Sequence, residues 1–342
     1  MKQKTIFVVD DNSTNLAVVE ESLEEQYRVI TFLSAAKMLA VLEKVTPDLI
    51  LLDIEMPEMD GYEAMKQLKS VDSQSEIPVI FLTGLIDDAS EALGIELGAV
   101  DFITKPFSKP VLLNRIKHHL HIDELIHERT NRLNNLKNSI VFVLADMVEN
   151  RDQGTGGHIE RTTAYIDILI NTMLTRGVYA DEISKMDLES LVSSARLHDV
   201  GKITISDAIL NKPGKLTDEE FAIMKTHAAE GERIINQIIA RTGEEEFLHN
   251  AQLFAGYHHE RWDGNGYPYG LKETHIPLQG RIMAIIDVYD ALISERPYKI
   301  PFSHEETVTI IINNSGTQFD PFIADMFFDV RDQFNAMRLT KT

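Results

Sequence analysis

Five short apolar runs, separated by stretches with helical periodicity, occupy the first 120 residues and constrain the fold of this chain most strongly. Each run has the length of a β-strand that is buried on both faces. Strands that alternate regularly with helices are typical of a parallel sheet covered by helices on both sides. We therefore predict a doubly wound α/β domain with five parallel strands. The runs are IFVV (6–9), RVITF (28–32), DLILL (48–52), IPVIFL (77–82) and DFI (101–103).

The pattern changes after about residue 150, where nearly the whole chain takes on helical periodicity. Loops rich in glycine and proline interrupt it, notably at 211–216 and 263–270. We predict an all-α bundle for this half. A length of 342 residues is ample for two separate cores. The predicted helices lie within 158–175, 187–199, 217–240, 245–259 and 279–294.

No strong break separates the two halves between residues 108 and 150. Five apolar residues in this stretch step by three, four, three and four positions, the spacing of a helix that pairs along one apolar seam. One interpretation is a long helix that pairs with a second copy of the chain, and the alternative is a helix packed on the second domain. We favour the homodimer. The seam residues are Leu133, Leu136, Ile140, Val143 and Met147.

The composition is that of a soluble protein with two domains, which we place at 1–122 and 139–342 with a connecting helix, a candidate coiled coil, at 123–138. A formal net charge of −21 repels phosphate backbones, so we expect no DNA partner. No apolar run approaches the roughly 18–20 residues of a membrane span, and the first run is too short for a secretion signal. The chain has no cysteine, which fits a reducing compartment. We expect a cytoplasmic protein.

Polar side chains follow four of the predicted strands at the points where the strands end. Asp10 and Asp11 follow the first strand, Asp53 the third, Thr83 the fourth and Lys105 the fifth. The carboxyl ends of parallel strands converge on one crevice, so these side chains should lie together. Clustered carboxylates suit Mg²⁺, and Asp53 can serve as a nucleophile for a phosphoryl group. The alternative is that the acids only cap a helix and line a loop.

These residues, with the stretches MPEMDGYE (56–63) and KPF (105–107), resemble the receiver domain of two-component response regulators, which has a flavodoxin-like fold. The resemblance implies that Asp53 accepts phosphate from a sensor histidine kinase. It implies an Mg²⁺ ion bound to carboxylates of the crevice, and an aromatic switch residue on the fifth strand. The residues concerned are Asp10 (through water), Asp11, Asp53, the carbonyl of Glu55, Thr83, Lys105 and the switch residue Phe102.

Five of the twelve histidines fall in short segments of the second half, three of them beside an acid or another histidine. Each lies on or at the end of a predicted helix, and helix-borne ligands that point into a bundle commonly build metal sites. Neighbours on a helix point about 100° apart, so His198 and Asp199 would reach different ions, or Asp199 would bridge two. The alternative is that the histidines only pack in the core. Two acids complete a set of seven candidate ligands: His158, His198, Asp199, His227, His258, His259 and Asp287.

Seven ligands are too many for one ion that keeps an open coordination position. They suit two ions that share a bridging ligand. Imidazole with carboxylate and no thiolate suits iron, manganese or zinc, and we favour iron or manganese. Two ions about 3.5–4 Å apart can stabilise both the attacking and the leaving oxygen of a phosphodiester. The second half is therefore predicted to be a metal-dependent phosphohydrolase.

The segments HDVGK (198–202) and HHERWDGNGYP (258–268) closely resemble the HD-GYP family of metal phosphohydrolases, and the likeness covers roughly 139–330. The resemblance implies hydrolysis of cyclic di-GMP to pGpG, with a further step to GMP left open, and it implies the seven residues above as metal ligands. On physical grounds Asp199 should bridge the ions as a catalytic residue. The bases that the resemblance assigns to the substrate are Lys202, which also has a catalytic role, Arg296 and Lys299.

One position departs from the family pattern. Some members carry a glutamate four residues before the first histidine and bind a third metal, but Gly154 stands there in this chain. Glu149 is an acid nearby whose spacing differs. We therefore predict two metal ions in the second domain.

The two resemblances together predict a response regulator whose phosphodiesterase output is controlled by phosphorylation at Asp53, through the connecting helix. Two alternatives stay open. One is a phosphodiesterase for another cyclic dinucleotide, and the other is a module that binds cyclic di-GMP or a protein without cleaving anything.

Overall fold

The computed structural model describes residues 3–84, 88–151, 157–243, 245–294 and 300–340. The chain divides into two compact units, Met1–Asn134 and Asn135–Thr342, and each is described by itself. No helix among the described residues is long and apolar enough to cross a membrane.

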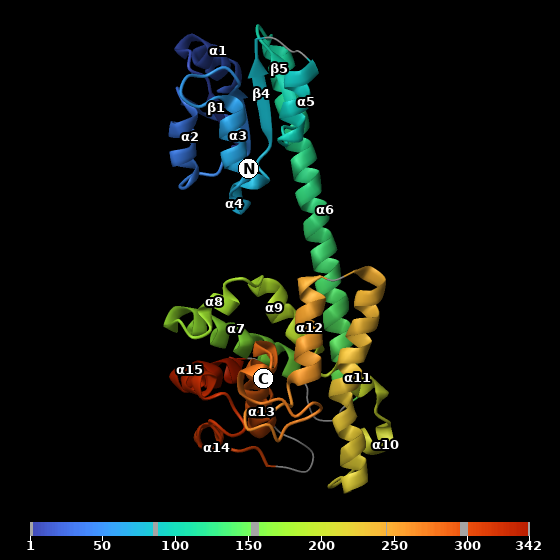
Figure 1. Cartoon of the computed structure of the whole chain (residues 1–342). Helices are drawn as coiled ribbons and strands as arrows, with labels where there is room; N and C mark the ends of the chain where they lie inside the picture. Colours follow the sequence, from blue (N-terminus) through green and yellow to red (C-terminus); the bar gives the residue numbers. More distant parts are fainter. Residues whose placement is uncertain (1–2, 85–87, 152–156, 244, 295–299, 341–342) are drawn as a thin grey trace. The chain divides into compact units, whose positions relative to one another are not determined.

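The first unit contains a sheet of five parallel strands in the order β2-β1-β3-β4-β5 (Figure 1). This confirms the predicted doubly wound sheet. The strands form because their apolar residues are buried on both faces; in β1, Phe7 and Val9 enter one core while Ile6 and Val8 enter the other. The strand bounds are β1 Thr5–Val9, β2 Arg28–Phe32, β3 Leu49–Asp53, β4 Val79–Thr83 and β5 Asp101–Thr104.

Helices cover both faces of this sheet. Met38 of α2 and Met65 of α3 contribute to one core, whereas Leu16 of α1 and Ile116 of α6 contribute to the other. Asp60 begins α3 with a capping box, in which its side chain accepts from the backbone N–H of Glu63. The helices of the first unit are α1 Ser13–Leu23, α2 Ala35–Leu42, α3 Gly61–Lys69, α4 Asp72–Ser75 and α5 Asp88–Glu96, and α6 begins there at Lys109.

Helix α6 runs without a break from Lys109 to Glu149, as the uninterrupted periodicity predicts (Figure 1). Ala145 and Val148 near its end are buried in the second unit. The five seam residues of α6 are all at least 48% exposed, with Leu133 at 66%. The seam is therefore exposed along its whole length. Its predicted pairing with a second copy of the chain stays a prediction.

The second unit is helical, as predicted, around one large core built mainly by α7, α13 and α15. Tyr165 of α7 stacks on Phe334 of α15, with ring centroids 4.5 Å apart, and meets Tyr289 of α13 edge-on. The helices are α7 His158–Arg176, α8 Ala180–Ile183, α9 Leu188–Ser194, α10 Asp207–Leu210, α11 Asp218–Thr242, α12 Glu246–Tyr257, α13 Leu278–Ile293, α14 His304–Asn313 and α15 Pro321–Thr340.

One predicted helix is shorter than expected. The stretch 187–199 was predicted as a single helix, but α9 ends at Ser194 and two 3₁₀ turns follow, Ala195–Leu197 and Val200–Thr204. The hydroxyl of Ser194 donates to the carbonyl of Leu191, a local bond that competes with regular helix formation. His198 and Asp199 therefore stand between two 3₁₀ turns and not on one α-helix.

Gly201 sets how closely this turn approaches α11. A Cβ atom at residue 201 would lie 1.9 Å from the carbonyl oxygen of His227 and 2.5 Å from the backbone nitrogen of Gly231. Only glycine permits this contact, which brings the segment that carries Asp199 against the helix that carries His227.

Candidate phosphoacceptor site and metal centre

The candidate phosphoacceptor site lies at the carboxyl ends of β1, β3 and β5. The Lys105 ammonium lies 2.6 Å from Oδ2 of Asp10 and 2.8 Å from Oδ2 of Asp53. Both carboxylates are buried, and Asp10 also accepts from the backbone N–H of Asn12 and the amide of Asn15. Burial raises the pKa of Asp53, against the opposing effect of Lys105. The structure thus brings together Asp53 and two groups, Asp10 and Lys105, that lie 95 residues apart in the sequence.

The remaining predicted residues of this site surround these three. Asp11 is exposed, and its carboxylate lies within 4.8 Å of those of Asp10 and Asp53 in a group that can hold a metal ion. Thr83 is buried at the end of β4. The Glu55 side chain is exposed, while its backbone hydrogen-bonds to Asp53. Phe102 is half-buried, with its ring centroid 5.6 Å from that of Phe81.

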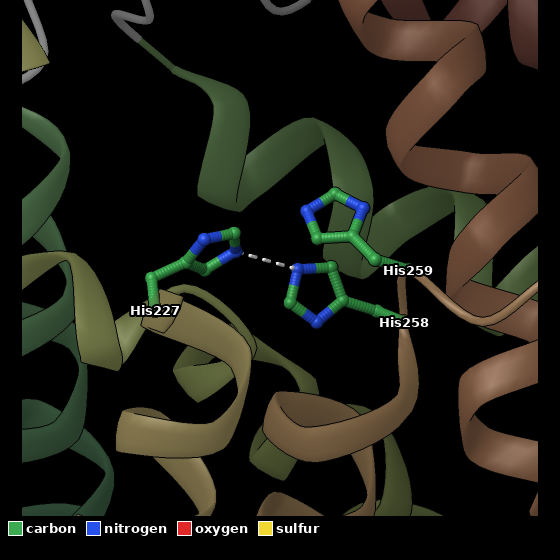
Figure 2. A group of neighbouring side chains, drawn as sticks. All are labelled: His227, His258 and His259. Carbon is green, nitrogen blue, oxygen red and sulfur yellow. Dashed lines mark hydrogen bonds between the residues drawn. The ribbon is translucent and has the colours of Figure 1, made fainter. Parts of the chain in front are cut away.

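In the second unit, six of the seven predicted ligands form two groups of three. We call His158, His198 and Asp199 the first subsite, and His227, His258 and His259 the second subsite; within each, one ligand atom per residue lies within 4.8 Å of the others. Figure 2 shows the second subsite, with His227 facing His258 and His259. The seventh residue, Asp287 on α13, lies beside the first subsite with Oδ1 3.9 Å from Nε2 of His158.

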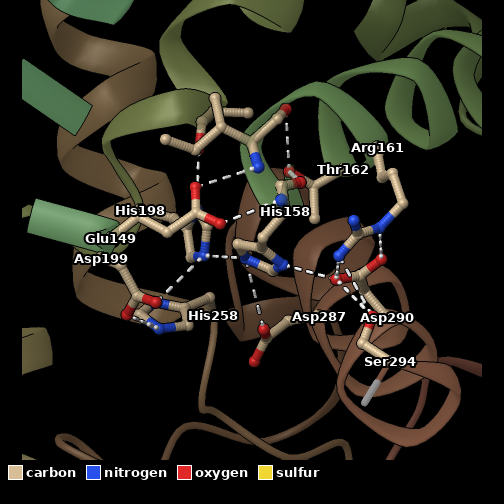
Figure 3. A network of polar contacts seen from close by, with 12 residues as sticks. Glu149, His158, Arg161, Thr162, His198, Asp199, His258, Asp287, Asp290 and Ser294 are labelled. Atoms are coloured by element: carbon tan, nitrogen blue, oxygen red, sulfur yellow. Dashed lines mark hydrogen bonds and ion pairs between the residues drawn. The ribbon is translucent and has the colours of Figure 1, made fainter. Parts of the chain in front are cut away.

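Imidazole nitrogens face each other within both subsites. Nε2 of His158 lies 3.3 Å from Nε2 of His198, and Nε2 of His227 lies 3.3 Å from Nε2 of His258 (Figures 2 and 3). The other ring nitrogen, Nδ1, already has a hydrogen-bond partner in each of these histidines. Nδ1 of His198, His227 and His258 contacts a backbone carbonyl at 2.9, 2.7 and 3.0 Å respectively.

A carbonyl oxygen only accepts, so each of these Nδ1 atoms carries the hydrogen. A neutral ring in this tautomer presents a bare lone pair at Nε2. Lone pairs that face one another at 3.3 Å repel unless a cation lies between them or one nitrogen is protonated. Fixing of the tautomer through Nδ1 is what metal-bound histidines commonly show.

Asp199 lies between the histidines of the two subsites, with one carboxylate oxygen toward each group. Its Oδ2 is 3.4 Å from Nε2 of His198, and its Oδ1 is 3.4 Å from Nε2 of His227 and 3.7 Å from that of His258. The Lys202 ammonium lies 2.8 Å from Oδ2. Oδ1 is buried and has no hydrogen-bond partner among the described residues. A buried carboxylate oxygen without a partner is costly, so this donor set fits divalent ions on both sides of Asp199.

Burial and charge set the protonation of these groups. Burial lowers the pKa of His258 to about 3, lowers that of His259 well below its usual value, and lowers that of His227. Burial opposes ionisation of Asp199, but Lys202 and His198 outweigh it and hold the pKa of this carboxyl well below its usual range. The second subsite is therefore composed of neutral imidazoles next to an ionised carboxylate, which is the state that binds metal.

Sequence reasoning missed the residues that support His158. Its Nδ1 lies 2.7 Å from Oδ2 of Asp290, and Arg161 donates through Nε and Nη2 to the same carboxylate (Figure 3). Burial raises the pKa of Asp290, but Arg161 and His158 overcome this and lower it to about 2. Asp290 lies three residues after Asp287 on one helix, and Arg161 lies three residues after His158 on another. Their helical spacing from these candidate ligands was the sequence signal that could have identified them.

Glu149 also contacts the first subsite. Its carboxylate accepts from the backbone N–H of His158 at 2.9 Å and of Ile159 at 3.3 Å, which caps the start of α7 (Figure 3). The sequence singled Glu149 out only as an acid at a different spacing. Gly154, Arg296 and Lys299 lie outside the described residues, so their predicted roles stay predictions.

The loop after His259 is held by a buried carboxylate. Glu260 accepts three backbone N–H groups, from Tyr269 at 2.7 Å, Gly270 at 3.1 Å and Leu271 at 2.9 Å. The Tyr267 ring lies over His259 with centroids 4.7 Å apart. The loop therefore forms one wall of the second subsite.

Each subsite borders a cavity. A cavity of about 30 Å³ at the first subsite is lined by Glu149, His158, Asp199, Lys202 and Asp287, among others. A second, of about 330 Å³, lies against the second subsite, with Lys225, Arg261 and Tyr267 in its lining. Cations at both openings offset the acidity of the chain where an anionic ligand would enter.

A doubly wound domain with an acidic crevice, joined to a helical domain with a His/Asp centre, defines the class of response regulators with an HD-type output domain. The chain belongs to the HD domain family, whose model matches residues 142–323, and it carries a response regulator receiver domain at 6–117. Below, the first unit is called the receiver domain and the second the HD domain.

Three relatives illustrate the likeness. A protein of Vibrio cholerae named "Probable cyclic di-GMP phosphodiesterase" is 41% identical over 98% of this chain and 79% of its own length. The "Cyclic di-GMP phosphodiesterase response regulator RpfG" of Xanthomonas campestris is 33% identical over 96% of this chain and 88% of its own length. The "3'3'-cGAMP-specific phosphodiesterase 2" of Vibrio cholerae is 36% identical over 58% of this chain and 36% of its own length.

Proposed function

We propose that the chain is a phosphodiesterase that hydrolyses cyclic di-GMP at a centre of two divalent ions in the HD domain. The observation that carries this proposal is the position of Asp199 between two groups of imidazole Nε2 atoms, with its Oδ1 buried and lacking a partner among the described residues. The proposed ligands are the first subsite with Asp287 for one ion and the second subsite for the other, with Asp199 shared between them.

Bound divalent ions would polarise the phosphodiester and supply an activated water as the nucleophile. The chain's own residues hold the ligands and the substrate. Lys202 carries its positive charge at the edge of the first subsite, where it can stabilise charge that develops on phosphate oxygens. Arg296 and Lys299 complete the proposal as bases that hold the nucleotide.

Cyclic di-GMP is preferred as the substrate because the relatives that align with nearly the whole chain carry this nucleotide in their names. The named cGAMP-specific relative aligns over 58% of the chain. A mixed cyclic dinucleotide is the second candidate. A panel of cyclic dinucleotides, assayed with Mn²⁺ or Fe²⁺ and followed by chromatography, distinguishes them and separates pGpG from GMP as product. Preference for the mixed nucleotide by more than about tenfold in kcat/KM, which is about 1.4 kcal/mol, would contradict the assignment.

A module that binds without cleaving is the remaining alternative. All seven candidate ligands are present, and six of them form the two groups described above. A double variant, His198→Ala with Asp199→Ala, should abolish turnover of cyclic di-GMP. Equal rates of product formation by the wild type and this variant would overturn the metal mechanism.

Regulation is proposed to begin at Asp53. Its contact with Lys105, and the nearby carboxylates of Asp10 and Asp11, support phosphorylation by a sensor kinase with Mg²⁺ bound in the crevice. Asp53→Asn, compared with wild-type protein treated with a phosphoryl mimic, tests this. If turnover and oligomeric state are the same in both, coupling between the domains is absent.

The exposed seam of α6 supports a homodimer. Five apolar side chains at heptad-like spacing, each about half exposed or more, are expected to pair with a second copy. Ile140→Asp should shift the protein from dimer to monomer in sedimentation velocity, while Asn135→Asp on the same helix is the matched control. A monomeric wild type at micromolar concentration would contradict the pairing.

A further inference from the structure

The end of α6 contacts the metal centre directly. Ala145, Val148 and Glu149 line the cavity at the first subsite, next to His158 and Asp199. Ala145 and Val148 are buried, at 5% and 6% exposed. One wall of the proposed active site is therefore supplied by the end of α6.

Two charged residues at this end bond to opposite sides of the first subsite. On one side, Glu149 accepts from the backbone N–H groups of His158 and Ile159, so it fixes the first turn of α7 and with it the first ligand. A carboxylate at a helix N-terminus interacts favourably with both the unpaired N–H groups and the helix dipole.

On the other side, Arg151 bonds to the segment that follows Asp199. Its guanidinium donates at 3.1 Å to the carbonyls of Ile203 and Ile205, and at 2.8 Å to the carboxylate of Asp207. Ile205 is buried, and the 3₁₀ turn between it and Asp199 carries Lys202. The pairing with Asp207 and the contact with the Ile203 carbonyl are exposed, so the part-buried contact with the carbonyl of Ile205 contributes most to the attachment.

We propose that Glu149 and Arg151 are positioning residues of the metal centre. Together they hold His158 on one side and the Asp199–Lys202 segment on the other at the separation that the first subsite requires. Helix α6, which begins at Lys109 in the receiver domain, ends at Glu149, and Arg151 follows two residues later. The inference rests on the proposed two-metal function.

The test measures metal affinity and not only activity. The full-length chain is stripped of metal and titrated with Mn²⁺ by calorimetry, in an Asp11→Asn background that removes a carboxylate of the receiver's own cation site. Glu149→Gln keeps the size but loses the charge, and Arg151→Lys keeps the charge but loses the fork that spans two carbonyls. The matched controls on the same helix are Asp146→Asn and Arg132→Lys.

Glu149→Gln should weaken one of the two Mn²⁺ sites by about 10–100-fold, the usual effect of removing support from a ligand, and leave the other within about twofold. Arg151→Lys should weaken the same site by a similar factor and the other site to a smaller extent, because it supports the segment of the shared ligand Asp199. The thermal midpoint of unfolding and the controls should be unchanged. A purely structural role would instead lower the thermal midpoint and weaken both sites equally.

Wild-type affinity at both sites in the two variants overturns the inference, and so does a parallel loss of stability and of both sites. Should Glu149→Gln not fold, Arg151→Lys decides by the same criteria. If the Asp11→Asn protein without further substitutions binds no Mn²⁺ in the HD domain, the proposed two-metal function itself is refuted. This failure is seen before any variant is compared, so it is distinguishable from failure of the inference.

Discussion

The Nδ1 atom of His158 lies 2.7 Å from Oδ2 of Asp290, and this contact fixes the ring so that Nε2 faces His198. Arg161 donates two hydrogen bonds to the same carboxylate, which keeps it ionised and acceptor-only. Asp290 thus determines which nitrogen of His158 is presented to the first subsite.

Asp290→Asn should weaken metal binding at the first subsite by about 10–100-fold, because a neutral amide holds the imidazole less firmly in the required tautomer. The measurement is Mn²⁺ titration of the metal-free protein, with Asp325→Asn, an acid on α15, as the control. Unchanged affinity in Asp290→Asn would show that the carboxylate only packs the core.

The Lys202 ammonium is expected to act on the transition state. Lys202→Gln should lower kcat by roughly 10²–10³-fold, with a smaller change in KM, because the charge is most useful as phosphate oxygens become more negative. Steady-state kinetics with cyclic di-GMP measure this, and Lys212→Gln, which breaks an ion pair with Glu220 in the same domain, is the matched control. A rise in KM alone would assign Lys202 to ground-state binding.

Gly201→Ala should destabilise the HD domain by about 1–3 kcal/mol, since its Cβ would overlap the carbonyl of His227 and force the segment away from α11. Urea unfolding measures the change in the free energy of unfolding. Gly84→Ala is the control, because a Cβ there meets nothing within 4 Å. Equal stability of the two variants would mean that the turn is not held against α11.

Without metal, the HD domain should lose stability as the pH falls. Burial lowers the pKa of His258 to about 3, whereas an unfolded histidine titrates near its ordinary value of 6.5. Between these two pH values the unfolded state therefore binds a proton at this histidine that the folded state does not bind. The free energy of unfolding present above about pH 6.5 declines progressively toward about pH 3.

Thermal unfolding of the metal-free protein between pH 8 and pH 5 tests this dependence. His249→Gln, which changes a histidine on α12 outside the centre, should leave the slope unchanged, while His258→Gln should reduce it. A midpoint that is flat over this range in the wild-type protein contradicts the assigned protonation state.

Much of this architecture follows from local signals in the sequence. The five strands were predictable because each is a run of residues buried on both faces, as in β1 from Thr5 to Val9. The grouping of six of the seven candidate ligands was predictable because several histidines and acids in short motifs exceed what packing requires.

The supporting contacts were not predictable in the same way. Helical spacing marks Asp290 and Arg161 each as a neighbour of a candidate ligand, but the two lie 129 residues apart and this spacing does not predict that they pair. The end of α9 at Ser194 was missed because its apolar periodicity continues through Leu197, while side-chain hydrogen bonds and the contact at Gly201 change the backbone. Tertiary contacts of this kind override helical periodicity.

The central claim is that Asp199 is shared by two ions, and metal stoichiometry tests it most directly. Metal-free protein in the Asp11→Asn background is titrated anaerobically with Fe²⁺ or Mn²⁺ while bound metal and hydrolysis of cyclic di-GMP are measured on the same sample. The account predicts that turnover reaches its maximum at two ions per chain and that Asp199→Asn reaches neither full occupancy nor turnover. Full activity with one ion per chain, or two tightly bound ions in Asp199→Asn, would contradict it.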